Sequence, residues 1–308
     1  MVTASGVRIG WADLPDHVRA EVERIIGAPV VSAVSQPGGF SPGTADRVRT
    51  ADGRRAFVKA VSPAQNEHSP VMHRQEARVS AALPATAPAP DLLGVFDDGH
   101  WVALVLADVE GRHPAPPWRA DELDRVLAAL DTLADECTPA PVPGLRPVAE
   151  ALSVDLGGWE RIAADPPADL DPWTAAHLDD LCALAARART VLTGDTLVHL
   201  DIRADNLLIT DDGQVTVVDW PWACLGPAWL DRLLLLINVR LFGGHDTEAL
   251  LRRCARRTGA DPADLRSVLA GMGGFFADAA RLPPAPGLPT LREFQRAQAD
   301  AVVGWLRL

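Results

Sequence analysis

The first third of the chain alternates short apolar runs with turn residues, whereas most of the remainder repeats apolar residues every three to four positions. The short runs are rich in Val and are bounded by Gly, Pro and Asp, a pattern typical of strands in an antiparallel sheet. The strands that this pattern predicts are residues 30–34, 47–49, 56–61, 92–96 and 101–106. We therefore expect a strand-rich N-terminal region.

Helical spacing of apolar residues marks the other segments. The helix at residues 14–26 opens with Pro15 and Asp16 and stops at Gly27, which are common helix boundary residues. A second helix is expected at residues 69–83. The later helices that the pattern predicts are one from residue 121 to before Pro139, and residues 147–162, 173–192, 229–242, 246–258, 262–276 and 291–308. The C-terminal region should therefore be mainly helical.

One hairpin interrupts this helical region. Residues 207–210 and 215–218 are apolar and extended, and Asp-Asp-Gly between them is a turn signal. Such a turn places Asn206 and Asp219, at the outer ends of the two strands, side by side. One amide oxygen and one carboxylate suit Mg²⁺, which keeps several waters and also binds substrate phosphates. Asp201 lies outside the pair, where it could accept a proton from a hydroxyl.

The segment from His199 to Asn206 has the pattern H-x-D-x-x-x-x-N, and Asp219 follows the hairpin within Val-Val-Asp-Trp. This combination resembles the catalytic and metal-binding loops of the protein-kinase-like fold, in the form found in the aminoglycoside phosphotransferase family. The resemblance extends over residues 30–231. It implies an α+β, bilobal fold with an N-terminal nucleotide-binding sheet lobe at residues 1–106, a hinge at 107–111, and a helical lobe with the substrate site at 112–308.

The resemblance also implies roles for residues in these two loops. Asp201 would position and deprotonate the acceptor hydroxyl, and Asn206 with Asp219 would hold Mg²⁺. Arg203 would either neutralise charge on the transferred phosphate or form a salt bridge within its own loop. Asp231, near the start of a later helix, is expected to hold the catalytic loop in place.

Lys59 is the only lysine among 29 basic residues. It falls on the third predicted strand, and the resemblance implies that its ammonium binds the α- and β-phosphates of ATP. Glu76 on the following helix is the expected partner of Lys59, with Glu67 as a weaker competitor. Glycine lets backbone N–H groups approach a polyanion closely. The loop between the first two strands is accordingly the expected phosphate cover; it contains Gly38, Gly39, Phe40 and Ser41.

Two further positions follow from the resemblance. The backbone groups of Asp108 and Val109 are expected to bond adenine at the hinge, whereas their side chains are not expected to read the base. Leu200 stands where the family commonly has glycine. This departure weakens any close analogy of substrate.

The amino-acid composition and the distribution of charge limit the kinds of partner that the protein could bind. The net charge is −12, and residues 107–198 alone carry −10 of it. An acidic chain is a poor partner for nucleic acid and could favour a cationic small molecule, although solvated helix faces are the better explanation for most of these carboxylates. The four cysteines have no paired spacing, and no apolar run is long enough to span a membrane. We expect a cytoplasmic protein with no membrane partner.

The function expected is Mg²⁺-dependent transfer of the γ-phosphate of ATP or GTP to a hydroxyl of a small molecule. By resemblance the acceptor would be an antibiotic of aminoglycoside, peptide or nucleoside type, and the role resistance or self-protection. The alternatives are a metabolic kinase for a choline-like, sugar or amino-alcohol substrate, and a catalytically silent nucleotide-binding protein. The sequence carries no motif for the acceptor, the choice between ATP and GTP, or the oligomeric state.

Overall fold

The computed structural model describes residues 8–36, 43–284 and 288–307. The chain forms two compact units. The sheet unit contains the described residues from Arg8 to His113 together with Asp205–Ala223. The helical unit contains Pro114–Ala204 and the chain from Cys224 onward. The division of the chain at a hinge over residues 107–111 stays a prediction.

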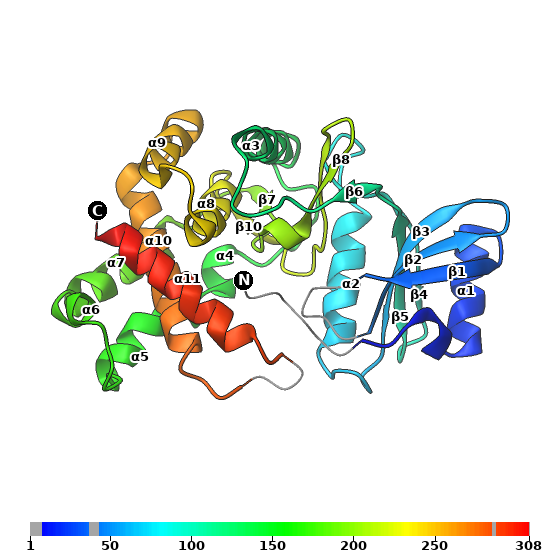
Figure 1. The fold of residues 1–308 in the computed structure, drawn as a ribbon, viewed down its shortest axis with the longest axis horizontal. Coiled ribbons are helices and arrows are strands. Elements are labelled where there is room, and N and C mark those ends of the chain that lie inside the picture. The colour runs from blue at the N-terminus through cyan, green and yellow to red at the C-terminus, as the bar shows by residue number, and fades with distance from the viewer. Residues whose placement is uncertain (1–7, 37–42, 285–287, 308) are drawn as a thin grey trace. The chain divides into compact units, whose positions relative to one another are not determined.

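The sheet unit is built on a five-stranded antiparallel sheet of order β1-β2-β3-β5-β4 (Figure 1). Its strands are β1 (Val30–Ser35), β2 (Thr44–Thr50), β3 (Arg55–Val61), β4 (Leu92–Asp97) and β5 (Val102–Ala107). These are the five strands expected from the apolar runs, with ends that differ by a few residues.

A helix covers each face of this sheet (Figure 1). Helix α1 (Asp16–Ile26) follows the short 3-10 helix η1 (Trp11–Asp13) and packs its apolar stripe on one face, where Val58 is completely buried. Helix α2 (Ser69–Ser80) lies on the opposite face, against Leu104 of β5. Because side chains alternate along a strand, Lys59 points to the α2 face while its neighbour Val58 points to the α1 core.

The predicted hairpin belongs to a second, three-stranded sheet of the same unit. Strand β6 (Gly111–Arg112), which was not predicted, pairs with β8 (Leu207–Thr210), and β8 pairs with β9 (Val215–Val217). The turn has Gly213 at φ 83°, a conformation that glycine adopts without a steric penalty.

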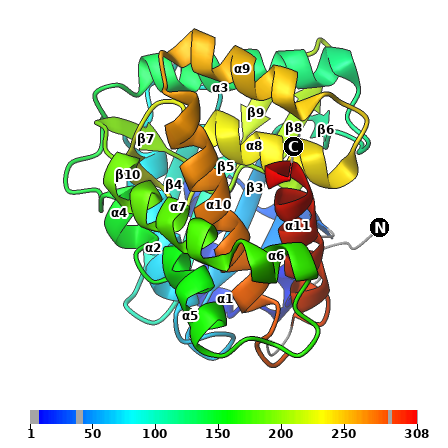
Figure 2. The same ribbon diagram turned by 90° about the vertical axis from the view of Figure 1, so that its left-hand side faces the viewer.

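The helical unit contains most of the helices (Figure 2). Its elements are α3 (Ala120–Glu136), α4 (Val148–Ala151), η2 (Asp155–Gly157), α5 (Gly158–Ala164), α6 (Pro172–Ala176), α7 (Leu178–Val191), β7 (Thr196–Val198), β10 (Cys224–Gly226), α8 (Leu230–Phe242), α9 (Thr247–Thr258), α10 (Pro262–Ala279) and α11 (Leu291–Leu306). The 3-10 helix η3 (Ala204–Asn206) begins at the last residue of this unit before the chain enters the sheet unit. Strands β7 and β10 pair antiparallel.

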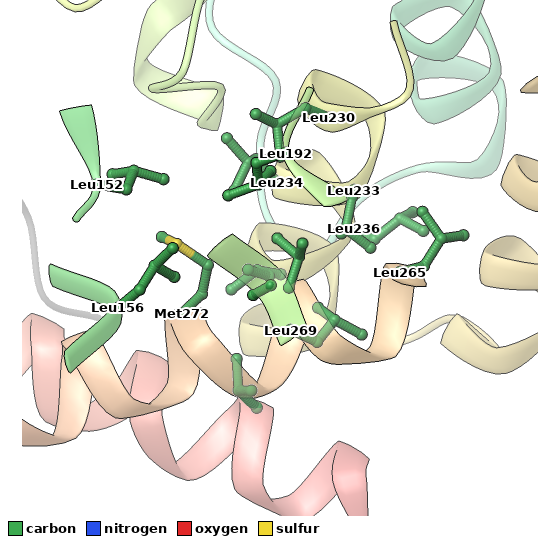
Figure 3. Close-up of a cluster of buried hydrophobic side chains, with 14 of the residues drawn as sticks. Leu152, Leu156, Leu192, Leu230, Leu233, Leu234, Leu236, Leu265, Leu269 and Met272 are labelled. Atoms are coloured by element: carbon green, nitrogen blue, oxygen red, sulfur yellow. The ribbon is translucent and has the colours of Figure 1, made fainter. Parts of the chain in front are cut away.

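Helices α8 and α10 form the core of this unit, as Figure 3 shows. Leu230, Leu233 and Leu236 of α8 are almost completely buried, as are Leu265 and Leu269 of α10. Burying each such side chain contributes about 2 kcal/mol. The apolar run in α8 is therefore a core segment. Within the described part of the chain, no helix has the length and apolarity needed to span a bilayer.

Two of the predicted helices were wrong in extent. The segment predicted as one helix over 147–162 is broken into α4, η2 and α5, since the backbone leaves the helical conformation at Leu152, with φ of −95° and ψ of 8°, and at Gly157, with φ of −85° and ψ of 9°. The backbone at Gly158, the first residue of α5, approaches α10 closely. A Cβ atom on Gly158 would lie 2.1 Å from the carbonyl oxygen of Gly274. The segment predicted over 173–192 is divided into α6 and α7 at His177, whose ring stacks on Trp173 at a centroid separation of 4.3 Å.

Candidate functional site

Lys59 is held between two carboxylates of the sheet unit. Its ammonium donates to both oxygens of Glu76 on α2, at 2.8 and 2.7 Å, and to Oδ1 of Asp219 at 2.5 Å. Lys59 is 8% exposed and Glu76 only 1%. The structure thus brings together three of the residues singled out from sequence. Glu67, the weaker competitor, lies before α2, and no bond of it with Lys59 is found in the described residues.

The charges in this cluster leave room for a cation. Burial by itself lowers the pKa of Lys59, but the charges and hydrogen bonds of Asp219 and Glu76 outweigh it and raise that pKa above its ordinary value. Lys59 is therefore positively charged. With both partners ionised, one ammonium faces two carboxylates and the cluster carries an excess of one negative charge. A bound metal ion would compensate that excess.

The hairpin places Asn206 next to Asp219 at the ends of its strands. The backbone N–H of Val218 donates to the carbonyl oxygen of Asn206 at 3.0 Å. Asn206 is 5% exposed, whereas the side chain of Asp219 is 31% exposed. An amide oxygen and a single carboxylate, completed by waters and phosphate oxygens, form a donor set that Mg²⁺ accepts. Among the residues described, no cluster of three or more His, Cys, Asp or Glu side chains could hold a metal without such help.

Asp219 has an unusual backbone conformation, with φ of 72°. The residue after it, Trp220, is buried and fixes the turn. Its indole N–H donates to the carbonyl of Val217 at 3.0 Å, and its backbone N–H lies 3.4 Å from Oε1 of Glu76. A non-glycine residue in the left-handed region costs about 1–3 kcal/mol, and such strain concentrates at functional sites. The structure therefore supports a special role for this aspartate.

The predicted catalytic loop lies in the helical unit. Arg203 donates from Nη1 to Oδ1 of Asp201 at 2.6 Å, which is the salt bridge within the loop that was one of the two alternatives for this arginine. The backbone N–H of Asp201 donates to Nδ1 of His199 at 3.2 Å. His199 is completely buried, so its ring supports the loop from inside.

Asp231 at the start of α8 holds the same loop. Its two carboxylate oxygens accept the backbone N–H groups of His199 at 2.7 Å and Leu200 at 3.0 Å. Burial raises the pKa of this carboxyl above its ordinary value. Leu200 has φ of 70°, a left-handed conformation that glycine adopts without a steric penalty. The side chain of Leu200 packs against the α8–α10 core.

The hinge residues are engaged within the sheet unit, and the expected backbone bonds to adenine stay a prediction. The carbonyl of Val109 accepts from the N–H of Gly111 at 3.1 Å. The side chain of Asp108 is only 4% exposed and binds two arginines, Arg47 of β2 and Arg55 of β3. Sequence reasoning had assigned no role to either arginine, because the pairing depends on which residues face each other across the sheet.

His73 was also missed. It precedes Glu76 by one turn of α2 and is 4% exposed. Its Nδ1 lies 3.1 Å from the carbonyl oxygen of Ser69, so this nitrogen carries the proton, while Nε2 has no hydrogen-bond partner among the described residues. Burial, with the charge of Lys59, lowers the pKa of His73 to about 3. Its spacing from Glu76 was the one available signal.

The predicted phosphate loop, with Gly38, Gly39, Phe40 and Ser41, lies outside the described residues. Its flanks are described. The backbone N–H of Gln36 donates to the carbonyl of Ala45 at 2.9 Å. Gly43 has φ of 99°, and a Cβ atom there would lie 2.4 Å from the carbonyl oxygen of Ala60. Only glycine fits at this position.

Similar folds occur in several crystal structures. An aminoglycoside phosphotransferase from Alicyclobacillus acidocaldarius subsp. acidocaldarius DSM 446 is 17% identical with a TM-score of 0.56, over 96% of this chain and 95% of that one. A thermostable mutant of aminoglycoside phosphotransferase APH(4)-Ia, in a ternary complex with ADP and hygromycin B, is 16% identical with a TM-score of 0.58, over 94% and 96%.

Choline kinase LicA from Streptococcus pneumoniae is 12% identical with a TM-score of 0.60, over 94% of this chain and 95% of that one. These likenesses confirm the predicted α+β, protein-kinase-like fold, with its antiparallel sheet followed by a mainly helical part. The three structures named are those of two aminoglycoside phosphotransferases and a choline kinase. No curated protein matches the chain in sequence.

The model of the phosphotransferase enzyme family, APH, matches residues 38–267, which include Lys59, Glu76, Asp201, Asn206 and Asp219. The match covers most of the chain and agrees with the resemblance read from the two loops. The chain belongs to the APH family of phosphotransferase enzymes.

Proposed function

We propose that this protein transfers the γ-phosphate of ATP or GTP to a hydroxyl group of a small molecule, with Mg²⁺ as cofactor. The observation that carries the proposal is the placement of Lys59 between Glu76 and Asp219. Asn206 lies next to Asp219, where the two strands of the hairpin begin and end. A cation for phosphates and a pair of oxygen ligands for a metal ion are the main requirements of phosphoryl transfer, which depends on positioning and charge neutralisation.

Each residue has a role in this proposal. Lys59 binds the α- and β-phosphates, and Glu76 holds its ammonium in place. Asn206 and Asp219 hold Mg²⁺, which supplies positive charge to the phosphate oxygens. Since Lys59 now donates to Asp219, binding of nucleotide and metal would replace that ion pair with separate partners for each residue.

Asp201 accepts the proton of the acceptor hydroxyl while the hydroxyl oxygen bonds to the γ-phosphorus. The bond between the γ-phosphorus and the oxygen that bridges it to the β-phosphate breaks, which releases ADP or GDP. Only four residues separate Asp201 from Asn206 in the chain. Arg203, now paired with Asp201, would orient that carboxylate, and its guanidinium could also neutralise charge on the transferred phosphate.

For the acceptor we propose an antibiotic of aminoglycoside, peptide or nucleoside type, which would make the protein a resistance or self-protection enzyme in the cytoplasm. A second candidate is a choline-like or other amino-alcohol metabolite, which the likeness to choline kinase LicA favours. Both classes include cationic molecules, in keeping with the acidic excess of residues 107–198.

A transfer screen tests the proposal. The purified protein would be mixed with Mg²⁺, ATP or GTP, and a panel of antibiotics, amino alcohols and sugars, and each product would be read by mass for one added phosphoryl group. The matched control is Asp201→Asn, which keeps the size of the side chain but removes the base. A phosphorylated antibiotic or amino alcohol that is absent from the control would name the acceptor class.

Two negative results have different meanings. If the protein binds nucleotide but phosphorylates nothing, even at high enzyme concentration, a catalytically silent role becomes the better explanation. If Asp201→Asn retains full turnover, the assignment of the base is wrong even though the enzyme class stands.

A further inference from the structure

The carboxylate of Asp108, the first residue after β5, is bound from two strands. Arg47 of β2 donates from Nε to Oδ1 at 2.6 Å and from Nη2 to Oδ2 at 2.8 Å. Nε of Arg55 of β3 lies 2.8 Å from Oδ2. Both oxygens of a side chain that is 4% exposed are thus engaged. Arg55 also forms an ion pair with Glu110, which lies two residues after Asp108. The segment after β5 is therefore attached to β2 and β3.

The strand register places Arg47 on the Lys59 face of the sheet. Arg47 lies directly opposite Phe57, and Ala45 lies opposite Lys59. Residues paired across antiparallel strands share a face, and so do alternate residues along one strand. Arg47, Phe57 and Lys59 therefore line one face, away from the α1 core that contains Val48 and Val58.

The environment of Arg47 suits a flat, uncharged ligand. Its bidentate bond to Asp108 raises the pKa of Arg47 and balances its charge, so a phosphate gains less from it than from an unpaired cation. The same bond holds the guanidinium in the plane of the carboxylate. The side chain remains 30% exposed. A planar, weakly hydrated guanidinium stacks well on aromatic rings.

We propose that Arg47 is a base-binding residue whose guanidinium stacks on the purine of the nucleotide, and that Asp108 is the positioning residue that holds it flat. This inference rests on the proposed nucleotide-dependent function and deepens it. Because both oxygens of Asp108 are engaged by arginines, its side chain does not read the edge of the base. Stacking is tolerant of base identity, since every purine has a π-face, so Arg47 contributes equally to ATP and GTP binding.

The test is calorimetric titration of ATP, GTP, adenosine and inorganic tripolyphosphate into the full-length protein. Arg47→Met is expected to weaken ATP, GTP and adenosine by the same factor, about tenfold from the usual strength of stacking on a base. Tripolyphosphate, which has no base, should bind as before. Asp108→Asn should weaken adenosine by about threefold, again without effect on tripolyphosphate.

Arg49→Met is the matched control. Arg49 lies two residues further along β2 on the same face, is exposed, and loses the same charge when replaced. The affinity of the Arg49→Met protein for adenosine should differ from that of the wild type by less than about twofold. If Arg47→Met does not fold, Arg47→Lys serves instead, since it keeps the charge beside Asp108 but lacks the flat fork, and a loss of adenosine affinity of about fivefold is expected.

The outcomes separate the two proposals. If the Arg47→Met protein binds adenosine as tightly as the wild type does, the proposed contact with the base is wrong, while the proposed function is unaffected. A loss of tripolyphosphate affinity equal to the loss for ATP also overturns it, because Arg47 would then act on phosphate. If the wild-type protein binds neither tripolyphosphate nor nucleotides, the proposed function fails and the inference fails with it.

Discussion

Lys59 is the only lysine of the chain, and the structure gives a reason for keeping an ammonium there. Its three N–H groups point to two oxygens of Glu76 and one of Asp219. A compact, rotatable ammonium can serve three acceptors in different directions, whereas the planar fork of arginine cannot. Every other Lys or Arg position of the chain is arginine, so the one lysine stands where the geometry suits an ammonium.

Lys59→Met should destabilise the protein and abolish transfer. Removing one partner from a buried ion pair costs about 3–5 kcal/mol, because Glu76 is left as a buried charge. The double variant Lys59→Met, Glu76→Gln removes that charge and should recover part of the loss. Urea unfolding measures both. Transfer should stay at least about a hundredfold lower in each variant; recovery of activity in the double variant would contradict a phosphate-binding role.

His73 makes stability depend on pH. Its pKa is about 3 in the folded protein and 6.5 ordinarily, so the unfolded chain takes up a proton more readily and protonation favours unfolding. Stability from this residue is therefore complete above pH 6.5 and falls as the pH drops toward 3. Relative to His73→Leu, the wild-type protein should lose free energy of unfolding over that range. Parallel pH curves for the two proteins would mean that His73 is solvated.

At the scale of the element, the predicted catalytic loop is held by α8 as well as by bonds within the loop. Asp231 accepts hydrogen bonds from two successive backbone N–H groups, those of His199 and Leu200, which precede it by 32 and 31 residues. A buried carboxylate with two such donors fixes the direction of the loop before Asp201. The hairpin, in contrast, is local, because a two-strand turn needs only its own residues.

Leu200 tests this balance between packing and strain. Its φ of 70° costs about 1–2 kcal/mol for a residue with a Cβ atom, while its side chain gains from contact with the α8–α10 core. Leu200→Ala loses the packing and keeps the strain, whereas Leu200→Gly loses both. We expect the glycine variant to be more stable than the alanine variant by about 1 kcal/mol in urea unfolding. The reverse order would show that the backbone relaxes.

At the scale of the whole molecule, the acidic excess of the middle third is partly balanced within the helical unit. Arg253 of α9 donates to Asp124 of α3 at 2.7 Å. Arg257 of α9 lies 3.4 Å from Asp131 and 3.2 Å from Asp135. These two arginines of α9 are thus partners of α3. These exposed pairs contribute little to stability, but they reduce the field available to attract a cationic acceptor.

Salt dependence of the acceptor KM measures what remains of that field. For a polycationic acceptor, raising the salt from about 0.05 to 0.5 M should increase KM by about two- to fivefold, because screening shortens the reach of the carboxylates. The KM of an uncharged hydroxyl acceptor serves as the control and should not change. A polycation whose KM is equally insensitive would show that the acidic excess does not contribute to acceptor binding.

The sequence alone determined the features that depend on short spacing. Alternating apolar runs predicted the five strands of the main sheet, and the turn after Thr210 predicted the hairpin that places Asn206 beside Asp219. These features follow from local backbone geometry, in which the position of a residue along the chain sets the direction of its side chain. The family resemblance rested on the same short spacings, which is why it was recognisable without the structure.

Only the tertiary structure decided the pairings across the fold. The bond of Lys59 to Asp219 joins residues 160 positions apart, and that of Arg47 to Asp108 joins residues 61 apart. The close approach of Gly158 to the backbone of Gly274 joins α5 to α10, which lie far apart in the sequence. In each case the partner is chosen by strand register or by the packing of another element, and no pattern within a single segment carries that information.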